Sequence, residues 1–125
     1  MILGLGVDLL DVPRMETELR KQGSDLRSEL FTPAEIAYCE SQHHPAQHYA
    51  ARFAAKEAVF KALRANGGDA ARWREVEVGA GAGGEPQVVL HGGLAELARG
   101  RGVTRILLSL SHTRALATAS AILES

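Results

Sequence analysis

The segment R-F-A-A-K-E-A-V-F-K-A-L at residues 52–63 constrains this chain more than any other feature. It is rich in helix-forming residues, and side chains four positions apart in a helix lie on the same side. One stripe of this helix carries Phe53, Glu57, Phe60 and Lys61. A buried face would exclude the two charges, and a solvated face would not need the two aromatic rings. The pattern indicates the wall of a polar site, or an ion pair between Glu57 and Lys61 beside core aromatics.

The size and composition of the chain predict a single domain over residues 1–125. Hydrophobic residues make up 46%, which is enough for one core, and aromatics only 5%, so aliphatic residues must supply most of the packing. The 14 basic and 15 acidic residues give a net charge of -1, which argues against nonspecific nucleic-acid binding. The one cysteine, Cys39, cannot form an internal disulfide.

The sequence also predicts where the protein works. No apolar run approaches the ~20 residues that a transmembrane helix needs. The start M-I-L-G-L-G-V-D lacks the charged segment and the cleavage site of a signal peptide. We therefore expect a cytoplasmic protein with no membrane and no nucleic acid among its partners.

Hydrophobic periodicity and turn residues predict the order of the elements. Strands are expected at residues 2–9, 73–79, 87–90, 104–111 and 116–123. Helices are expected at residues 13–21, 33–41, 46–64 and 92–100. Gly23 and the run N-G-G at 66–68 should end the first and third helices, while Thr32, Pro33 and Glu35 form a helix start. This order predicts an α+β domain with an antiparallel sheet packed against helices.

The first strand has two unlike faces. The face that we expect to enter the core carries Leu3, Leu5, Val7 and Leu9. The other face carries Ile2, Gly4, Gly6 and Asp8, and glycine in a strand usually marks a bulge or a close backbone approach. Asp8 is therefore either a functional carboxylate or a capping residue of the next helix, although Asp11 is nearer to that position.

Asp8 and Glu57 come from separate elements and would repel each other in the fold unless a cation joined them. Oxygen ligands of this kind suit Mg²⁺, which usually binds one or two carboxylates together with water and phosphate oxygens. Arg52, Lys56 and Lys61 lie on the same expected helix and could complement those phosphates. The sequence thus predicts a site for Mg²⁺ and a ligand that carries phosphate.

The strand at residues 104–111 offers further polar groups. Ser109 and Ser111 share one face and lead into His112. Hydroxyl and imidazole groups can donate to a phosphate, although a polar strand edge with a turn histidine also fits. No G-x-S-x-G elbow surrounds either serine, which disfavours a serine nucleophile.

The glycine-rich loop at 79–84 lacks the Lys-Ser/Thr of a P-loop and predicts a hairpin turn. A weak resemblance to a zinc cluster is given by His43, His44 and His48.

Three motifs and one arginine occur in a characteristic order: G-V-D at residues 6–8, Arg14, F-A-A-K-E-A-V-F-K-A-L at 53–63, and L-S-L-S-H-T at 108–113. This combination resembles the holo-[acyl-carrier-protein] synthases, the small 4'-phosphopantetheinyl transferases. The resemblance covers nearly the whole chain and implies a 4'-phosphopantetheinyl transferase-like fold. It implies transfer of 4'-phosphopantetheine from coenzyme A to a serine of apo-acyl carrier protein, for fatty acid biosynthesis, with release of adenosine 3',5'-bisphosphate.

The same resemblance implies roles for individual residues. Asp8 and Glu57 would hold Mg²⁺ against the coenzyme A pyrophosphate, with Lys61 beside the reacting phosphate. The candidate coenzyme A ligands are then Arg52, Lys56, Lys61, Ser109 and His112. The bases of the expected carrier-docking helix are Arg14, Arg20 and Lys21. The resemblance also implies a homotrimer whose active sites are shared between neighbouring subunits.

Two departures and three alternatives remain open. The larger two-module relatives have a second acid where this chain has Leu10, so we expect water to complete the metal coordination. Glu16 and Glu18 add negative charge to a helix expected to receive an acidic carrier. The serine proton could pass to a water on the metal or to Glu57, and the water is favoured because Glu57 is already committed as a ligand. A noncatalytic carrier- or coenzyme-binding module and a Mg²⁺-dependent nucleotide pyrophosphohydrolase are the other functions that the residues allow.

Overall fold

The structure, a computed structural model, describes residues 1–21, 25–65 and 70–125 of the chain. The elements follow in the order β1 (Ile2–Asp11), α1 (Val12–Arg20), α2 (Leu26–Leu30), α3 (Pro33–Glu40), α4 (Pro45–Leu63), α5 (Ala70–Arg74), β2 (Val76–Ala80), β3 (Pro86–Leu90), α6 (Gly92–Gly100), β4 (Arg105–His112) and β5 (Leu116–Glu124). The strands form a three-stranded sheet in the order β1-β5-β4 and a two-stranded sheet of β2 and β3. All pairs are antiparallel, which confirms the predicted α+β class.

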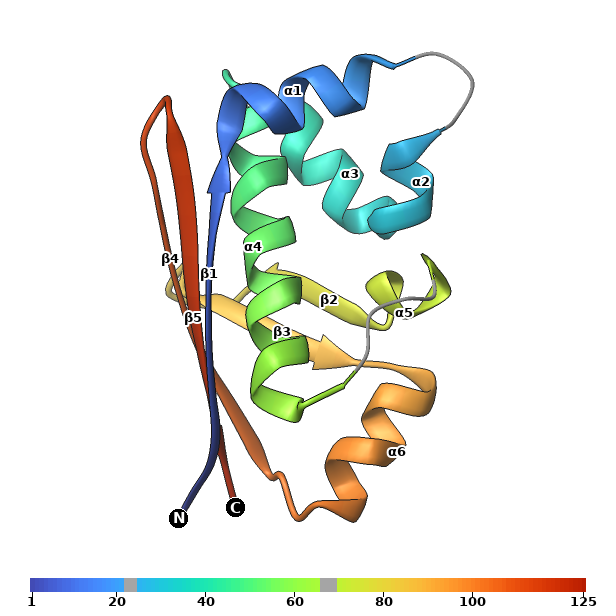
Figure 1. Ribbon diagram of the computed structural model, residues 1–125, viewed down its shortest axis with the longest axis vertical. Coiled ribbons are helices and arrows are strands. Elements are labelled where there is room, and N and C mark those ends of the chain that lie inside the picture. Colours follow the sequence, from blue (N-terminus) through green and yellow to red (C-terminus); the bar gives the residue numbers. More distant parts are fainter. Residues whose placement is uncertain (22–24, 66–69) are drawn as a thin grey trace.

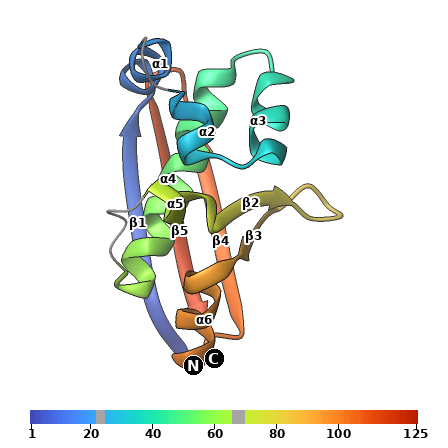
Figure 2. The ribbon, with the colours of Figure 1, turned by 90° about the vertical axis from the view of Figure 1, so that its right-hand side faces the viewer.

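Helix α4 is the central element of the molecule. It lies along one face of the three-stranded sheet, with α1, α2 and α3 gathered at one end and α6 near the other (Figure 1). The β2–β3 hairpin extends away from the long sheet (Figure 2). The two termini lie together at the end opposite α1, where the backbone N–H of Ser125 donates to the carbonyl of Met1. Residues of α4 can therefore reach both edge strands, β1 and β4.

Small residues allow α4 to approach the sheet closely. A Cβ atom on Gly6 would overlap the carbonyl oxygen of Ala58, and one on Gly4 would overlap that of Ala62. Across the ladder, Gly6 is opposite Ala121, and the inward side chains of β5 are the buried residues Ala117, Ala119, Ala121 and Leu123. The close backbone approach predicted from the glycines of β1 is confirmed.

The predicted core face of β1 was the wrong one. Leu5, Val7 and Leu9 are 68%, 57% and 63% exposed, and Leu3 is 40% exposed. The face with the glycines is the one that packs on α4. Alternation correctly grouped these residues, but it could not show that the helix approaches the face with the smaller side chains. The apolar face of β1 is left uncovered by the residues that the structure describes.

Local start signals positioned the helices well. The side chain of Asp11 accepts from the backbone N–H of Arg14 and caps α1, which leaves Asp8 free of the capping role that was one alternative. Thr32 and Glu35 form a reciprocal capping box at α3, which fixes two N–H groups that a helix start leaves unpaired. The α4 helix ends at Leu63, and its C-cap residue Arg64 adopts a left-handed φ of 54°.

Three features differ from the expectation. The α2 and α5 helices have five residues each and are too short to show a helical period. Trp73, expected in a strand, lies in α5, and β2 begins at Val76. The β2–β3 hairpin forms its own sheet instead of joining the long one. The predicted helix ends at Gly23 and at residues 66–68 lie outside the described residues.

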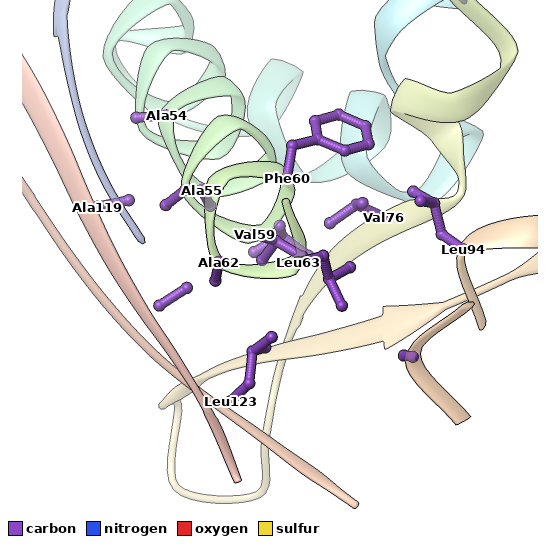
Figure 3. Close-up of a cluster of buried hydrophobic side chains, with 14 residues drawn as sticks. Ala54, Ala55, Val59, Phe60, Ala62, Leu63, Val76, Leu94, Ala119 and Leu123 are labelled. Atoms are coloured by element: carbon purple, nitrogen blue, oxygen red, sulfur yellow. The ribbon is translucent and has the colours of Figure 1, made fainter. Parts of the chain in front are cut away.

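Two clusters of buried side chains surround α4. The larger one joins α4 to β2, α6 and the inner face of β5 (Figure 3). Val59 and Leu63 of α4 occupy its centre, with Leu123, Val76 and Leu94 around them. The second cluster joins α1, α2, α3 and the first half of α4. None of the helices in the described ranges is long and apolar enough to cross a membrane.

Candidate active site

Asp8 and Lys61 meet where β1 passes α4. Asp8 lies on the same strand face as Gly6, so its side chain is directed at the helix. The Nζ atom of Lys61 donates to Oδ1 of Asp8 at 2.9 Å and to the carbonyl of Val7 at 3.0 Å. Lys61 is 53% exposed and Asp8 15% exposed, so solvent reaches the pair from the lysine side. Among the described ion pairs, Lys61 pairs with Asp8 across the fold and not with Glu57 along its own helix.

Glu57 lies beside this pair, one helical turn before Lys61. Its side chain is half-buried. Burial and the negative charge of Asp8 raise the pKa of Glu57 above its ordinary value, and the charge of Lys61 only partly opposes them. Because interaction between two charges weakens with distance, this shift is consistent with the two carboxylates lying near each other. The structure thus places Asp8, Glu57 and Lys61 where β1 passes α4, and their roles in metal and phosphate binding stay predictions.

The donor set of this convergence fits a divalent cation that prefers oxygen. Asp8 and Glu57 supply carboxylate oxygens, the ligands that Mg²⁺ favours. A cation between them would offset the repulsion that raises the pKa of Glu57. Over residues 1–21, 25–65 and 70–125, no third His, Cys, Asp or Glu side chain joins them to complete a metal-ligating group. The remaining ligands would then be water and substrate oxygens, as is usual for Mg²⁺.

Lys56 does not belong to this site, which corrects its assignment to phosphate and coenzyme A binding. Its ammonium is fully buried and donates to Oε1 of Glu35 at 2.8 Å, to the carbonyl of Trp73 at 2.9 Å, and to the carbonyl of Val76. Its three N–H groups are therefore committed. Burial lowers the pKa of Lys56, and Glu35 opposes that shift. The residue joins α4 to α3, α5 and β2.

Arg52 lines a separate hollow on the other side of α4. Only 7% of the residue is exposed, and its guanidinium stacks on the ring of Tyr38 at 3.9 Å. Its Nε atom has no hydrogen-bond partner among the described residues. The hollow has a volume of about 200 Å³ and lies between α3, α4, β4 and the β2–β3 hairpin. We call it the β4 hollow; its polar lining is formed by Tyr38, His48, Arg52 and His112.

The structure separates the two β4 candidates. His112 lines the β4 hollow, whereas Ser109 is exposed and lies on the opposite face of the strand. Ser109 and Val7 are both paired with Ser120 of β5, so Ser109 shares the outer face of the sheet with the uncovered apolar residues of β1. Within one chain, Ser109 and Arg52 therefore do not face the same site.

The basic side chains of α1 are exposed, but they differ in whether they already form an ion pair. Arg20 pairs with Glu16, and Lys21 pairs with Glu18 at 3.0 Å. Arg14 forms no ion pair within the part of the chain that the structure describes. It lines a groove of about 540 Å³ beside α1, which we call the α1 groove. Its apolar lining is formed by Leu9, Leu10, Met15, Leu26, Leu30, Phe53 and Trp73.

Comparison with known proteins assigns the chain to a family. The family model described as the 4'-phosphopantetheinyl transferase superfamily matches residues 4–117. The chain belongs to this superfamily. The matched range contains Asp8, Glu57 and Lys61, so the convergence described above lies inside the transferase domain.

Relatives across the superfamily agree with this assignment. A holo-[acyl-carrier-protein] synthase from Koribacter versatilis is 44% identical over 124 residues, which cover 99% of each chain. The crystal structure of a holo-[acyl-carrier-protein] synthase from Neisseria meningitidis matches with a TM-score of 0.90 and 29% identity, covering 100% of both chains. A synthase from Bacillus anthracis, solved in complex with CoA (3',5'-ADP), matches with a TM-score of 0.81 and 27% identity, covering 100% of this chain and 98% of that one. The resemblance and the transferase-like fold predicted from the sequence are confirmed.

Sequence reasoning missed Tyr38 in the β4 hollow, and it grouped His48 with His43 and His44 as a weak zinc candidate, a group that the described residues do not form. Tyr38 stacks on Arg52 from α3, and His48 packs against His112 with ring centroids 5.1 Å apart. His48 and Arg52 are four positions apart on α4, so helical spacing could have grouped them. No sequence signal links either one to Tyr38 or His112, because those contacts depend on how α3 and β4 pack against α4.

Proposed function

We propose that this chain transfers the 4'-phosphopantetheine group of coenzyme A to a serine of apo-acyl carrier protein, giving holo-acyl carrier protein and adenosine 3',5'-bisphosphate. The observation that carries the proposal is the convergence of Asp8, Glu57 and Lys61 in a member of the superfamily. The names of its relatives and the coenzyme in the Bacillus anthracis structure support the choice of substrates. The reaction belongs to fatty acid biosynthesis in the cytoplasm, and residues 1–125 act as one domain.

The chemistry requires charge neutralisation and positioning more than covalent help. Asp8 and Glu57 would hold Mg²⁺, which when bound stabilises the charge on the pyrophosphate of the coenzyme. The ammonium of Lys61, held 2.9 Å from Oδ1 of Asp8 and open to solvent, offsets the charge that builds on the transferred phosphate. Burial and the charge of Asp8 raise the pKa of Glu57 when no ion is bound, and a cation held between the two carboxylates would offset that shift.

The candidate coenzyme ligands lie on two sides of the molecule. Asp8, Glu57 and Lys61 meet where α4 passes β1, whereas Arg52 and His112 line the β4 hollow. β1 and β4 are the edges of the long sheet, with β5 between them. We infer that one coenzyme A molecule contacts both groups by bridging two subunits, so that the active site is shared between neighbours.

The uncovered face of β1 supports this assembly. Leu5, Val7 and Leu9 form an exposed apolar row, and rows of this kind on a sheet usually mark an interaction surface. Ser109 lies on the same outer face, where it would approach a ligand at the boundary between subunits. We propose that this face packs against further copies of the chain in a homotrimer.

We propose that the carrier docks on α1 and its groove. Carrier proteins of this kind are acidic, so they need a base that is free to pair with them. Arg14 fits this role because it lines the apolar α1 groove and forms no ion pair within the described residues. Arg20 and Lys21 are exposed and can add to the positive potential that attracts the carrier, although Glu16 and Glu18 already pair with them.

A mass measurement on an apo-carrier tests the transfer directly. Incubation with coenzyme A, Mg²⁺ and the protein should increase the carrier mass by one phosphopantetheine group, and a chelator should prevent the increase. Several apo-carriers that all keep their mass would contradict the proposal. A noncatalytic binding module would show no turnover as wild type or as Asp8→Ala, and the variant would still bind its partner. A pyrophosphohydrolase would instead release phosphopantetheine from coenzyme A when no carrier is present.

A further inference from the structure

His48 has no role in the motif or in the proposed transfer, yet it lies among the polar groups of the β4 hollow. Its half-buried imidazole packs on the ring of His112, with centroids 5.1 Å apart, and on the ring of Tyr38, with centroids 5.7 Å apart. One helical turn further along α4 is Arg52. Three elements therefore present basic or aromatic groups to the same small volume of about 200 Å³.

The composition of the hollow selects an anion. Its lining contains Arg52, His48 and His112 but no Asp or Glu among the described residues. The Nε atom of Arg52 is buried and has no partner there. A buried N–H without an acceptor is costly and uncommon. An anionic oxygen that enters from solvent would supply the missing acceptor, and a phosphate would also reach the two imidazoles.

The charges around His48 make its protonation depend on that anion. The groups that face it are Arg52 and His44 from α4 and its N-terminus, His112 from β4, and Tyr38 from α3. Burial lowers the pKa of His48, and the positive charges of His112, Arg52 and His44 lower it further. The protonated imidazole is therefore disfavoured when no ligand is bound. A bound phosphate would reverse the sign of the local field.

We propose that His48 binds a phosphate group of the coenzyme together with Arg52 and His112, and that it takes up one proton from solvent as the phosphate binds. The inference rests on the proposed coenzyme A site and adds a residue and a proton to it. No covalent bond forms or breaks. The proton returns to solvent when adenosine 3',5'-bisphosphate leaves, so coenzyme affinity and product release both depend on pH.

The expected size of the effect follows from linkage. Each unit by which ligand binding raises the pKa of His48 corresponds to about tenfold in affinity. Affinity should therefore be severalfold to about tenfold higher near pH 6.5 than near pH 8, as far as His48 is concerned. The second ionisation of a phosphate monoester, near pH ~6, acts in the opposite direction. The contribution of His48 is thus read from the difference between wild type and variant.

Calorimetry with adenosine 3',5'-bisphosphate measures this difference. Titrations in buffers of different ionisation enthalpy give the number of protons taken up on binding. We expect His48→Gln to take up fewer protons than wild type and to bind severalfold more weakly near pH ~6.5, with little difference near pH ~8. His43→Gln is the matched control, because His43 precedes α4 and does not line the hollow, and it should behave as wild type. Equal proton uptake in wild type and His48→Gln, or no binding to wild type, would overturn the proposal.

A second measurement uses the unaltered protein, so it does not depend on how the variant folds. The imidazole resonances of His48 in NMR spectra should report a higher pKa when adenosine 3',5'-bisphosphate is bound, and an unchanged value would also overturn the proposal. Neither experiment needs a carrier or Mg²⁺. Proton uptake by a chain that modifies no carrier would contradict the proposed function alone. Normal carrier modification without uptake by His48 would contradict this inference alone.

Discussion

Lys56 and Lys61 are five positions apart on α4 and have opposite environments. Lys56 is fully buried and bonded to Glu35 and to two backbone carbonyls. Lys61 is about half exposed and pairs with Asp8 at the convergence of carboxylates. Residue type alone predicts the same positive charge and the same role for both lysines. The helical period separates their faces, but only the packing of α3 and β2 shows which face is buried.

The first prediction contrasts these two lysines. Lys56→Met leaves the buried carboxylate of Glu35 without its partner, so the free energy of unfolding should fall by about 3–5 kcal/mol. Lys61→Met breaks a partly exposed pair, which should cost less than about 1 kcal/mol, but it should slow transfer by about 10²-fold or more. Urea unfolding and a carrier mass assay measure the two quantities. A stable Lys56→Met protein, or a fast Lys61→Met enzyme, would contradict the assignment of these roles.

Glu57 provides a prediction about pH. Its pKa is raised by burial and by Asp8, so the fold disfavours the ionised form. The destabilisation is absent at low pH, grows as pH rises through the ordinary value of a glutamate, and is complete above the raised value. In chelator, Glu57→Gln should therefore melt at the same or a higher temperature than wild type near pH ~7, and the difference should shrink near pH ~4.

A matched control for this measurement is available in α6. Glu96 is exposed, so Glu96→Gln should leave the melting temperature almost unchanged at both pH values. If Glu57→Gln were clearly less stable than wild type at neutral pH without metal, Glu57 would be a stabilising carboxylate of the fold. Its proximity to Asp8 would then have another explanation than a cation site.

At the scale of elements, the sequence predicted where helices begin better than which face of a strand is buried. Capping at Thr32 and Asp11 is a local signal, and it positioned α3 and α1 correctly. The inner face of β1 was wrong because the decisive fact is nonlocal: α4 lies so close that only Gly4 and Gly6 leave room for its backbone. Helices of five residues, such as α2 and α5, carry too short a pattern to be recognised.

For the candidate site too, the sequence identified residues by local motif but could not show contacts that depend on packing between elements. Asp8, Glu57 and Lys61 could be named because the family motif preserves their order in the chain, and the structure brings them together. Lys56 belongs to the same motif, but burial removes it from the site. His48 was named only as a weak zinc candidate, because its neighbours Tyr38 and His112 come from other elements. The type of each residue indicated the chemistry that its side chain can perform, and the packing of the elements decided whether that side chain reaches the site.

Helix α1 supports a prediction about the carrier. Arg14 forms no ion pair within the described residues, whereas Arg20 and Lys21 are already paired with acids of the same helix. Arg14→Glu should therefore raise the KM for an acidic carrier by about tenfold and change kcat much less. Arg20→Glu should have a smaller effect on KM, because Arg20 is partly neutralised. Steady-state kinetics with one carrier compare the two, and an unchanged KM for Arg14→Glu would move docking away from α1.

At the scale of the whole molecule, the proposed trimer would join the exposed apolar face of β1 to activity. Leu5 is 68% exposed and lies next to the glycines that contact α4. A charge at this position, in Leu5→Glu, should disfavour a packed interface without entering the core of the chain. We expect a smaller particle in light scattering and a loss of transfer, although Asp8, Glu57 and Lys61 are intact.

The control for assembly is an apolar change at the same place. Leu5→Met should keep both the particle size and the activity, because it conserves hydrophobic character and nearly conserves volume. A fully active Leu5→Glu monomer would show that a single chain contains a complete active site. The proposal that neighbouring subunits share each site would then be wrong.

The most direct test of the account is the stoichiometry of Mn²⁺, used as a spectroscopic substitute for Mg²⁺, in the presence of coenzyme A. Paramagnetic resonance should show one bound ion per chain in wild type, with similarly large losses of affinity in Asp8→Asn and Glu57→Gln. The double variant should lose little more than either single one, because two ligands of the same ion are not independent. If either single variant binds Mn²⁺ as tightly as wild type, the two carboxylates do not share an ion and the central claim is wrong.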